Sequence, residues 1–349
     1  MSTFSHLTRE KVMECLKRVN EPVLNENIIS LGLVHEIEVD KARVFLHMEN
    51  ASSDPGVRNE LTEKIKSVLG EAGASHVEIH FSGKPKCGMG GQEAEPLSGV
   101  KHVIAVSSGK GGVGKSTAAV NLALALKKLG ARTGLMDGDI YGPNIPIMLG
   151  IPSDRRTEPG GSGKILPIEA HGIRAVSIGF FANPEQPMIW RGPLLHKTVQ
   201  EFLHRVEWGE LDFLVVDLPP GTGDVQLSLA QWVRVSGAVI VTTPQEVALA
   251  DVRRAINMFR QLEIPVLGVV ENMTGPVFGR GGGERVAKDF QVPFLGDIPL
   301  DAEIRECGDA GVPIVAATAG SGTSERFIKI AEAIRQAFYK NDNPSKTRS

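Results

Sequence analysis

A glycine-rich segment at residues 109–117, with the sequence GKGGVGKST, has the residue types and spacing needed to bind a phosphate group. Glycines let successive backbone NH groups turn inward around an anion. Lys115 would reach the β- and γ-phosphates of a nucleotide, and Ser116 would offer its hydroxyl group to Mg²⁺. The pattern predicts nucleotide-phosphate binding by Gly109, Lys110, Gly111, Gly112, Val113, Gly114, Lys115, Ser116 and Thr117.

The sequence on either side of this segment provides what a phosphate-binding loop requires, a buried strand before it and a helix after it. Residues 103–106 form a short apolar run typical of buried parallel strands, and residues 118–126 are almost continuously apolar. Residues 127–130, KKLG, mark the expected helix end. This context favours a phosphate loop over a plain glycine-rich turn, and Lys115 argues against the dinucleotide fingerprint of a dehydrogenase.

Acidic residues directly follow two other apolar runs of the chain. Asp137 and Asp139 follow one run, and Asp217 follows another. A carboxylate at a strand end near a phosphate loop is what Mg²⁺ requires, usually through water. We therefore expect Asp217 and Ser116 in the Mg²⁺ shell, and Asp139 to orient the attacking water. A single Asp after a strand is often a turn or helix-cap residue, but two such clusters beside a phosphate loop favour phosphoryl chemistry.

The first lysine of the loop, Lys110, needs a separate explanation. It lies too early in the loop to curl easily onto the phosphates that the loop wraps. A partner chain's copy could instead reach across a symmetric interface, as an arginine finger does in trans. We therefore expect a homodimeric ATPase with Lys110, Lys115 and Asp139 as catalytic residues.

The amino-terminal part of the chain is predicted to be a separate small domain. A length of 349 residues exceeds what one hydrophobic core usually serves. Residues 1–82 mix helical and strand periodicities, which predicts an α+β domain. Polar and apolar residues alternate over 76–82, which places His76 and His80 on the solvent side of a strand. Residues 83–100 are rich in Gly, Pro and charge, which predicts a linker.

Residues 101–340 are predicted to form an α/β domain with a doubly wound, mainly parallel sheet of the P-loop NTPase kind. Apolar runs alternate there with helical segments, which is typical of βα units. Residues 324–339 read as a closing helix, and residues 341–349 as a frayed tail. The predicted strands are residues 103–106, 133–136, 175–178, 213–216, 238–241, 266–270 and 294–295.

Composition excludes several classes of protein. Hydrophobic residues make up 42% and charged residues 23%, and no run of 18 apolar residues occurs. The first residues do not have the pattern of a signal peptide. A net charge of -3 provides no broad footprint for nucleic acid or an anionic membrane. Three widely separated cysteines argue against a disulfide framework. We expect a cytoplasmic protein that binds neither nucleic acid nor membranes.

The loop resembles the deviant phosphate loop of the family that includes the nitrogenase iron protein and the septum-site and partition ATPases. Across residues 101–340 the chain is similar to the Mrp/ApbC family of iron-sulfur cluster carriers, and residues 27–34, NIISLGLV, resemble the small iron-sulfur assembly domain often fused ahead of this ATPase. The segments that carry the resemblance are residues 136–144 (MDGDIYGPN), 190–193 (WRGP), 217–224 (DLPPGTGD), 241–245 (VTTPQ) and 271–273 (ENM).

The resemblance implies a slow, dimeric ATPase that assists iron-sulfur cluster assembly or transfer to client or scaffold proteins, with Lys110 contacting the nucleotide of the opposite subunit. It also implies Thr117 near the α-phosphate and Asn272 at the adenine base, although Asn272 also suits a strand-end turn. The resemblance also implies two switch segments. The first contains Asp137 and Asp139, and the second contains Gly221, Thr222, Gly223 and Asp224.

The cysteines that hold a cluster in this family are missing. Relatives that carry clusters have a CxxC shortly after ENM, whereas residues 271–283 read ENMTGPVFGRGGG. Cys87, in the linker, or Cys307, expected in a turn, could pair with its symmetry mate, or either could be an incidental thiol. Residues 50–55 also lack the reactive cysteine of many relatives, and residues 279–283 suit either a second anion loop or a shortened hairpin.

The missing cysteines leave the cluster ligands unknown. They also keep a second function open, because iron-sulfur clusters are bound chiefly by thiolates. The alternative is a cluster-free, ATP-dependent dimer switch that binds a protein partner through surfaces reshaped by the two switch segments.

Overall fold

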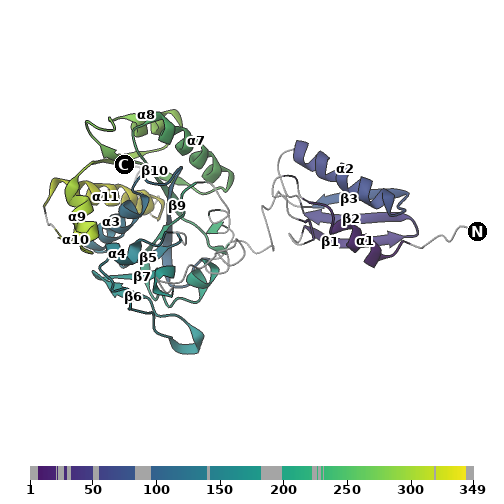
Figure 1. The fold of residues 1–349 in the computed structure, drawn as a ribbon, viewed down its shortest axis with the longest axis horizontal. Helices are drawn as coiled ribbons and strands as arrows, with labels where there is room; N and C mark the ends of the chain where they lie inside the picture. Colours follow the sequence, from purple (N-terminus) through teal and green to yellow (C-terminus); the bar gives the residue numbers. More distant parts are fainter. Residues whose placement is uncertain are drawn as a thin grey trace, which may run out of the picture. The chain divides into compact units, whose positions relative to one another are not determined.

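The computed structural model describes residues 7–20, 22, 27–29, 33–49, 55–82, 96–139, 142–181, 199–221, 226, 229–230, 232–317 and 320–342. The chain divides into two compact units, Met1–Glu93 and Ala94–Ser349 (Figure 1). Several residues discussed above lie outside the described residues: residues 50–54, Cys87, residues 190–193, Thr222, Gly223 and Asp224.

The described part of the first unit is a three-stranded sheet packed against helices. The strand order is β1-β2-β3, with β1 antiparallel and β3 parallel to β2. Apolar side chains of both helices, such as Leu16 and Ile65, pack with Leu46 and Met48 of the central strand. The elements are α1 (Arg9–Leu16), β1 (Val34–Asp40), β2 (Arg43–Glu49), α2 (Pro55–Glu71) and β3 (His76–Ser82).

The second unit is built on a sheet of eight strands among its described residues, which confirms the predicted fold class. Neighbouring strands are parallel except β6, which runs antiparallel to β7 at one edge. The sequence did not predict β6 because a three-residue edge strand has almost no periodicity. In spatial order the strands are β11 (Phe294–Pro299), β10 (Val266–Thr274), β9 (Gly237–Thr242), β4 (Val100–Ser108), β8 (Leu211–Asp217), β5 (Thr133–Asp137), β7 (Ile173–Ser177) and β6 (Ile168–Ala170).

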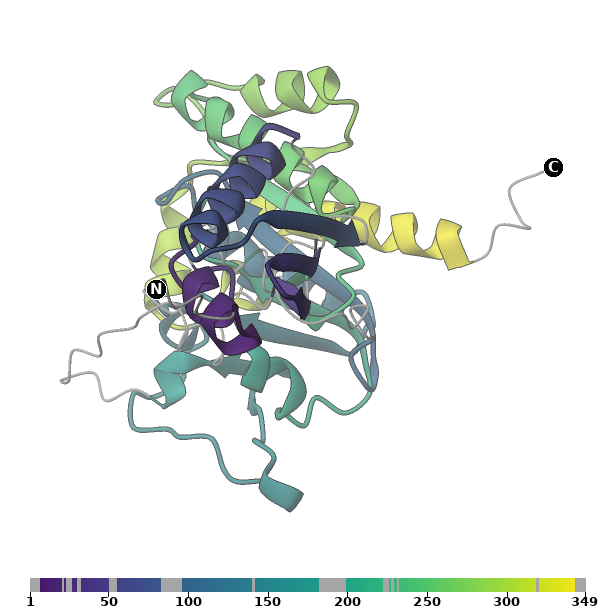
Figure 2. The same cartoon turned by 90° about the vertical axis from the view of Figure 1, so that its right-hand side faces the viewer.

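Helices cover both faces of this sheet, as a doubly wound fold requires. One face packs against α3 (Lys115–Lys128), α4 (Ile145–Met148), α10 (Ile314–Ala317) and α11 (Gly322–Asp342), the long yellow helix of Figure 2. The other face packs against α7 (Glu246–Gln261), α8 (Gly282–Asp289) and residues 199–206. No helix among the described residues is long and apolar enough to span a lipid bilayer.

Some predicted boundaries and one predicted turn differ from the structure. Helix α11 continues to Asp342, two residues into the predicted tail. Strand β7 ends at Ser177 rather than at residue 178, because the Ser177 hydroxyl accepts a hydrogen bond from the backbone NH of Gly179 and starts a 3-10 turn. Cys307 lies within helix α9 (Ala302–Asp309) and not in a turn, since Asp301 caps that helix through the backbone NH of Glu303.

The strand order places the phosphate-loop segment at the centre of the sheet. Strand β4 lies between β9 and β8, and the chain continues from it to one side through β5 and later to the other side through β9. Such a topological switch point leaves room for a ligand beyond the carboxyl ends of the strands. In register, Val106 of β4 lies beside Asp217 of β8, which in turn lies beside Asp137 of β5.

Candidate functional site

The segment between β4 and α3 forms a loop whose backbone requires glycine. Gly114, the residue before α3, has φ of 79°, in the left-handed region that favours glycine. A Cβ atom there would also collide with the side-chain amide of Asn272, and one on Gly109 would collide with Asp251 of α7. The predicted loop is therefore packed tightly between β10 and α7, directly before the start of α3.

Lys115 brings together the charged residues that the sequence predicted separately. Its Nζ lies 2.6 Å from Asp217 Oδ1 and 3.6 Å from Asp139 Oδ2, and it donates a hydrogen bond of 3.2 Å to Ser116 Oγ. The Lys115 side chain is 6% exposed and that of Asp217 is 1% exposed. A buried lysine held by two carboxylates at the mouth of a glycine-rich loop provides a positive charge where phosphate oxygens would arrive.

Asp137 lies behind this group as a buried carboxyl. It accepts hydrogen bonds from Ser177 Oγ at 2.9 Å and from the backbone NH of Asp139 at 3.1 Å. Burial, together with the charge of Asp217, raises the pKa of Asp137 to about 8. Burial also raises the pKa of Asp217, although Lys115 opposes that change. Asp137 therefore holds the Asp139 backbone in place without adding a second full negative charge beside Asp217.

The raised pKa of Asp137 predicts a pH-dependent stability for the nucleotide-free protein. Between pH 4 and 8 the folded carboxyl keeps a proton that the unfolded chain has lost, so the free energy of unfolding should rise as pH falls through this window. Replacing Asp137 with Asn should remove a difference on the order of 3 kcal/mol between pH 8 and pH 5. Urea unfolding at both pH values measures it, and parallel wild-type and variant profiles would contradict it.

The side-chain oxygen atoms beside Lys115 suit Mg²⁺. Asp217 Oδ2 is buried and has no hydrogen-bond partner among the described residues. The Ser116 hydroxyl lies on the first turn of α3, next to Lys115. Oxygen ligands of this kind are those that Mg²⁺ prefers, with nucleotide oxygens and water completing its shell. The unsatisfied carboxylate oxygen is therefore consistent with a metal-bound water at this position.

A cavity of about 370 Å³ adjoins the phosphate loop on the side of β10. Asn272 lines it and also donates a hydrogen bond of 2.8 Å to the backbone oxygen of Val113. Thr117 lines the same cavity from the first turn of α3. The lining also includes apolar and polar side chains that the sequence did not single out, namely Met148, Leu300, Ile304 and Arg305. A cavity lined by apolar and polar side chains beside a phosphate loop is suited to the base of a nucleotide.

The end of β10 contains two further residues that sequence reasoning missed. Glu271 is fully buried, and its carboxylate accepts hydrogen bonds from the backbone NH groups of Gly281 and Gly283. Met273 has φ of 59° at a register shift between β10 and β11, so the strand bends immediately after Asn272. A glutamate inside the apolar run VVENM is the signal that could have indicated a structural partner for Glu271.

The segment after β10 forms a short hairpin over residues 275–279, and residues 279–283, which suited either a second anion loop or a shortened hairpin, run from the end of this hairpin into α8. Gly275 and Gly279 exchange two backbone hydrogen bonds of 2.9 and 2.8 Å. The NH groups of Gly281 and Gly283, at the start of α8, already bind the Glu271 carboxylate. An internal carboxylate therefore occupies the position that an external anion would need.

The described part of the two switch segments is tied to the loop through its backbone. The NH of Gly138 donates to the carbonyl of Asp217 at 2.8 Å, and the NH of Gly221 donates to that of Ser108 at 2.9 Å. Gln226 is buried, and its amide donates to the carbonyl oxygens of Pro219 and Gly221. These contacts hold the described parts of both segments at the carboxyl ends of the central strands β4 and β8.

No group of three or more His, Cys, Asp or Glu side chains that could hold a metal ion occurs among the described residues. The structure describes Cys15 and Cys307, and both are free thiols of intermediate exposure. Burial and the nearby carboxylates, Glu303 and Glu306 among them, raise the pKa of the Cys307 thiol. A raised pKa lowers the fraction of thiolate, which is the form that binds iron.

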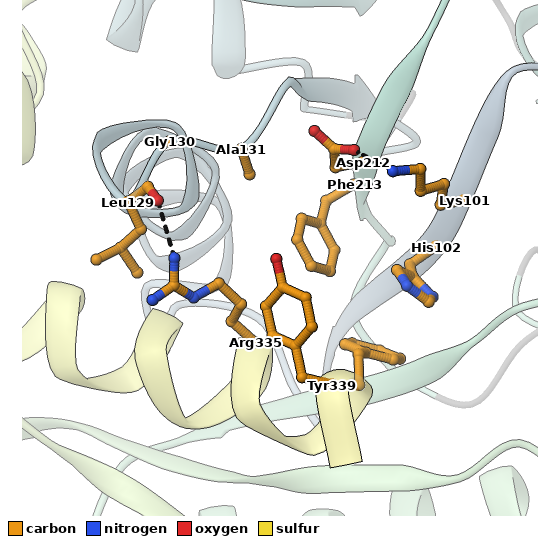
Figure 3. A pocket seen from close by; sticks show the side chains of 10 residues that line it. Lys101, His102, Leu129, Gly130, Ala131, Asp212, Phe213, Arg335 and Tyr339 are labelled. Atoms are coloured by element: carbon orange, nitrogen blue, oxygen red, sulfur yellow. Dashed lines mark hydrogen bonds and ion pairs between the residues drawn. The ribbon is translucent and has the colours of Figure 1, made fainter. Parts of the chain in front are cut away.

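Another hollow, of about 170 Å³, lies at the amino ends of the strands, where β4 and β8 begin (Figure 3). His102 stacks on Phe213 and Phe338, with ring centroids 5.3 and 4.4 Å away. Arg335 of α11 donates to the backbone oxygen of Leu129 at 2.9 Å. These contacts join α11 to the strands and to the end of α3, so the residues around the hollow have a packing role.

Asp212 beside this hollow should contribute measurably to stability. Its carboxylate accepts hydrogen bonds from the side chain and backbone of Arg132 and from Lys101 Nζ at 2.8 Å, which hold the pKa of Asp212 well below its usual range. Replacing Asp212 with Asn should lower the free energy of unfolding at pH 7 by about 1–2 kcal/mol. The loss should shrink as pH falls below about 4, because the Asp212 carboxylate of the unfolded chain then begins to bind a proton while the folded one stays ionised.

Denaturant unfolding at pH 7 and pH 3.5 measures this effect of Asp212. Glu169 is a suitable control, because its side chain is 75% exposed and lies 3.8 Å from Arg174. Replacing Glu169 with Gln should change stability by less than about 0.5 kcal/mol. Equal losses for the two variants would contradict the role given to Asp212.

Comparison with known proteins follows the division of the chain. Residues 99–335 match the family described as NUBPL iron-transfer P-loop NTPase, and residues 9–80 match the family described as iron-sulfur cluster assembly protein. The chain is 42% identical over 342 residues to the iron-sulfur cluster carrier protein of Synechocystis sp., covering 94% of this chain and 97% of that protein. It is 40% identical over 347 residues to that of Escherichia coli, covering 95% and 92%.

Solved structures show the same fold for the second unit. A nucleotide-binding protein from Archaeoglobus fulgidus, in complex with ADP, superimposes with a TM-score of 0.54 at 38% identity, covering 62% of this chain and 88% of that one. The cell division ATPase MinD from Pyrococcus furiosus superimposes with a TM-score of 0.53 at 24% identity, covering 68% and 99%. Matches of this extent over both units show that the chain belongs to the iron-sulfur cluster carrier family of P-loop NTPases.

Proposed function

We propose that this protein is a Mg²⁺-dependent, homodimeric ATPase whose slow cycle assists the assembly of iron-sulfur clusters or their transfer to client or scaffold proteins. The observation that carries the proposal is the meeting of Lys115, Asp139 and Asp217 at the mouth of the phosphate loop. The family supports the iron-sulfur role, because its members are named cluster carriers.

In the proposed nucleotide complex, the loop NH groups and Lys115 bind the phosphates, and Lys115 turns from Asp217 toward them. Ser116 and Asp217 would hold Mg²⁺, with Asp217 acting through water. Mg²⁺ would neutralise charge that develops on the phosphate oxygens. Asp139, whose side chain is 15% exposed at the edge of the site, orients the attacking water. The cavity lined by Asn272 receives the base.

Lys110 supports the dimeric part of the proposal. It is partly exposed on the loop, and its backbone oxygen accepts a hydrogen bond of 2.9 Å from Ser108 Oγ, which fixes the backbone around it. In the symmetric dimer, each Lys110 reaches the nucleotide of the other subunit and stabilises the terminal phosphate in the transition state. A site completed only by a partner subunit links hydrolysis to association.

The second candidate function rests on the missing cysteine pair. The hairpin Gly275–Gly279 follows ENM, where the family resemblance implies a cysteine pair, and it contains no cysteine. The alternative function, a cluster-free switch that binds a protein partner, is favoured by this replacement and by the exposed side chain of Val277, which is 72% exposed on the hairpin. The ATPase chemistry is common to both functions.

Anaerobic reconstitution separates the two functions. A cluster carrier should bind iron and sulfide in equal amounts per dimer, and replacing Cys15, Cys87 or Cys307 with Ala should identify the thiols that hold them. The same samples should be tested for ATP-driven dimerisation by light scattering. Dimerisation without bound iron would reject cluster carriage and support the switch, whereas failure of ATP to bind at all would reject both.

A further inference from the structure

The outer face of the sheet in the first unit carries polar side chains in rows across the strands. On β2, Val44, Leu46 and Met48 are buried against the helices, so the alternate residues lie on the other face. Among these, His47 is paired in register with Glu36 of β1 and with His80 of β3. One row therefore runs from a carboxylate through two imidazoles.

The two imidazoles of this row lie side by side. The ring centroids of His47 and His80 are 5.6 Å apart and the ring planes differ by 53°. With metal–nitrogen bonds of about 2 Å, two imidazoles on one tetrahedral ion have centroids about 5 Å apart. The observed separation is thus close to that of a metal-bound pair, before any ion is added.

We propose that His47 and His80 form a binding site for a divalent ion of borderline softness, of the Zn²⁺, Co²⁺ or Ni²⁺ kind. Neutral imidazole nitrogen is a preferred ligand for these ions, whereas Mg²⁺ prefers oxygen. The site is therefore distinct in chemistry from the oxygen donors at Ser116 and Asp217. It is also independent of the nucleotide chemistry proposed above.

Two ligands from the chain and two or more waters would complete such a site. No third His, Cys, Asp or Glu side chain converges on the pair among the described residues. Glu36 is exposed in the same row and adds negative charge beside the ion. A two-histidine site open to water on one side predicts an exchangeable ion and an affinity in the micromolar range, well below that of a closed four-ligand site.

His76 provides a matched control on the same sheet face. It is exposed on β3 and is paired in register with Arg43, so its cross-strand neighbour is a cation and not an imidazole. Its Nε2 lies 3.9 Å from a Glu78 carboxylate oxygen. Loss of the His76 ring removes one surface imidazole but leaves the proposed pair complete.

The test is a Zn²⁺ titration of the full chain, without an added histidine tag and with saturating Mg²⁺ and ADP, in competition with a chromophoric chelator. The wild-type chain should bind one equivalent of Zn²⁺ with micromolar affinity. His47→Ala and His80→Ala should each weaken that affinity about tenfold or more. His76→Ala should leave that equivalent within about twofold of wild type. Zn²⁺ should also shift the imidazole NMR signals of His47 and His80 together.

The measurements can overturn the proposal directly. Unchanged Zn²⁺ affinity in either His47→Ala or His80→Ala would reject the pair, and so would an equal loss in His76→Ala. Urea unfolding of all three variants separates loss of the site from loss of the fold, because only folded variants enter the comparison. Should a variant unfold, the NMR titration of the wild-type chain decides: imidazole signals that shift independently, or not at all, reject the site.

Discussion

Replacing Lys110 with Ala is expected to reduce ATP turnover roughly 10³-fold while leaving ATP affinity nearly unchanged. The reason is that the lysine is proposed to stabilise charge in the transition state of the opposite subunit, where a cation supplied in trans has an effect of this size. Phosphate release measures turnover, and a fluorescent ATP analogue measures binding. Lys329, an exposed lysine on α11, is the control, because Lys329→Ala should retain wild-type turnover.

Mixing two inactive variants tests whether Lys110 acts across the dimer. A heterodimer of Lys110→Ala and Asp139→Ala chains has one site with an intact Asp139 and a lysine from the partner, so that site should hydrolyse ATP. With random association, half of the dimers are of this kind and the mixture should reach about a quarter of wild-type turnover. No recovery in a verified heterodimer would exclude the trans role, and ATP binding by both variants would still stand.

Replacing Lys115 with Ala should abolish hydrolysis and also lower the stability of the nucleotide-free protein by about 3 kcal/mol at pH 8. The loss of hydrolysis follows from the phosphate contact, and the loss of stability follows from Asp217. Its carboxylate is 1% exposed and would lose the Nζ group that lies 2.6 Å away. The penalty should be smaller at pH 5, because burial raises the pKa of Asp217 and protonation removes the uncompensated charge.

The double variant Lys115→Ala, Asp217→Asn separates these two effects. Asparagine removes the buried charge, so most of the lost unfolding free energy should return, as expected for two residues in direct contact. Hydrolysis should not return, because the phosphate contact and the metal-shell carboxylate are both absent. Guanidinium unfolding at pH 5 and pH 8, together with phosphate release, measures both. If Lys115→Ala is as stable as wild type at pH 8, the Lys115–Asp217 ion pair does not stabilise the nucleotide-free protein.

Much of the site could be predicted from local sequence because its parts obey local rules. The spacing of Gly109, Gly114 and Lys115 reflects what a backbone must do to surround a phosphate, and that requirement is met within nine residues. Asp137 and Asp217 stood out because each directly follows an apolar run, and strands of a doubly wound sheet end at the ligand edge. The fold class followed from the same alternation of runs.

Contacts between distant segments could not be predicted in this way. Asn272 binds the backbone oxygen of Val113 only because β10 enters the sheet on the β9 side of β4. Glu271 closes the hairpin after β10 through the NH groups of Gly281 and Gly283, which decides against an external anion there. The position of Cys307 in a helix likewise depended on the cap provided by Asp301.

The amino-acid sequence alone was therefore sufficient to predict a phosphate loop, acidic residues at strand ends and a two-part organisation, and to show that the cysteine pair is missing. The fold was needed to show that Lys115 lies between Asp139 and Asp217, that Asp137 is buried beside Asp217, and that His47 stands next to His80. The physical reason is one of range. Periodicity and turn chemistry act over a few residues, whereas strand order and register follow from packing of the whole core and set which side chains meet.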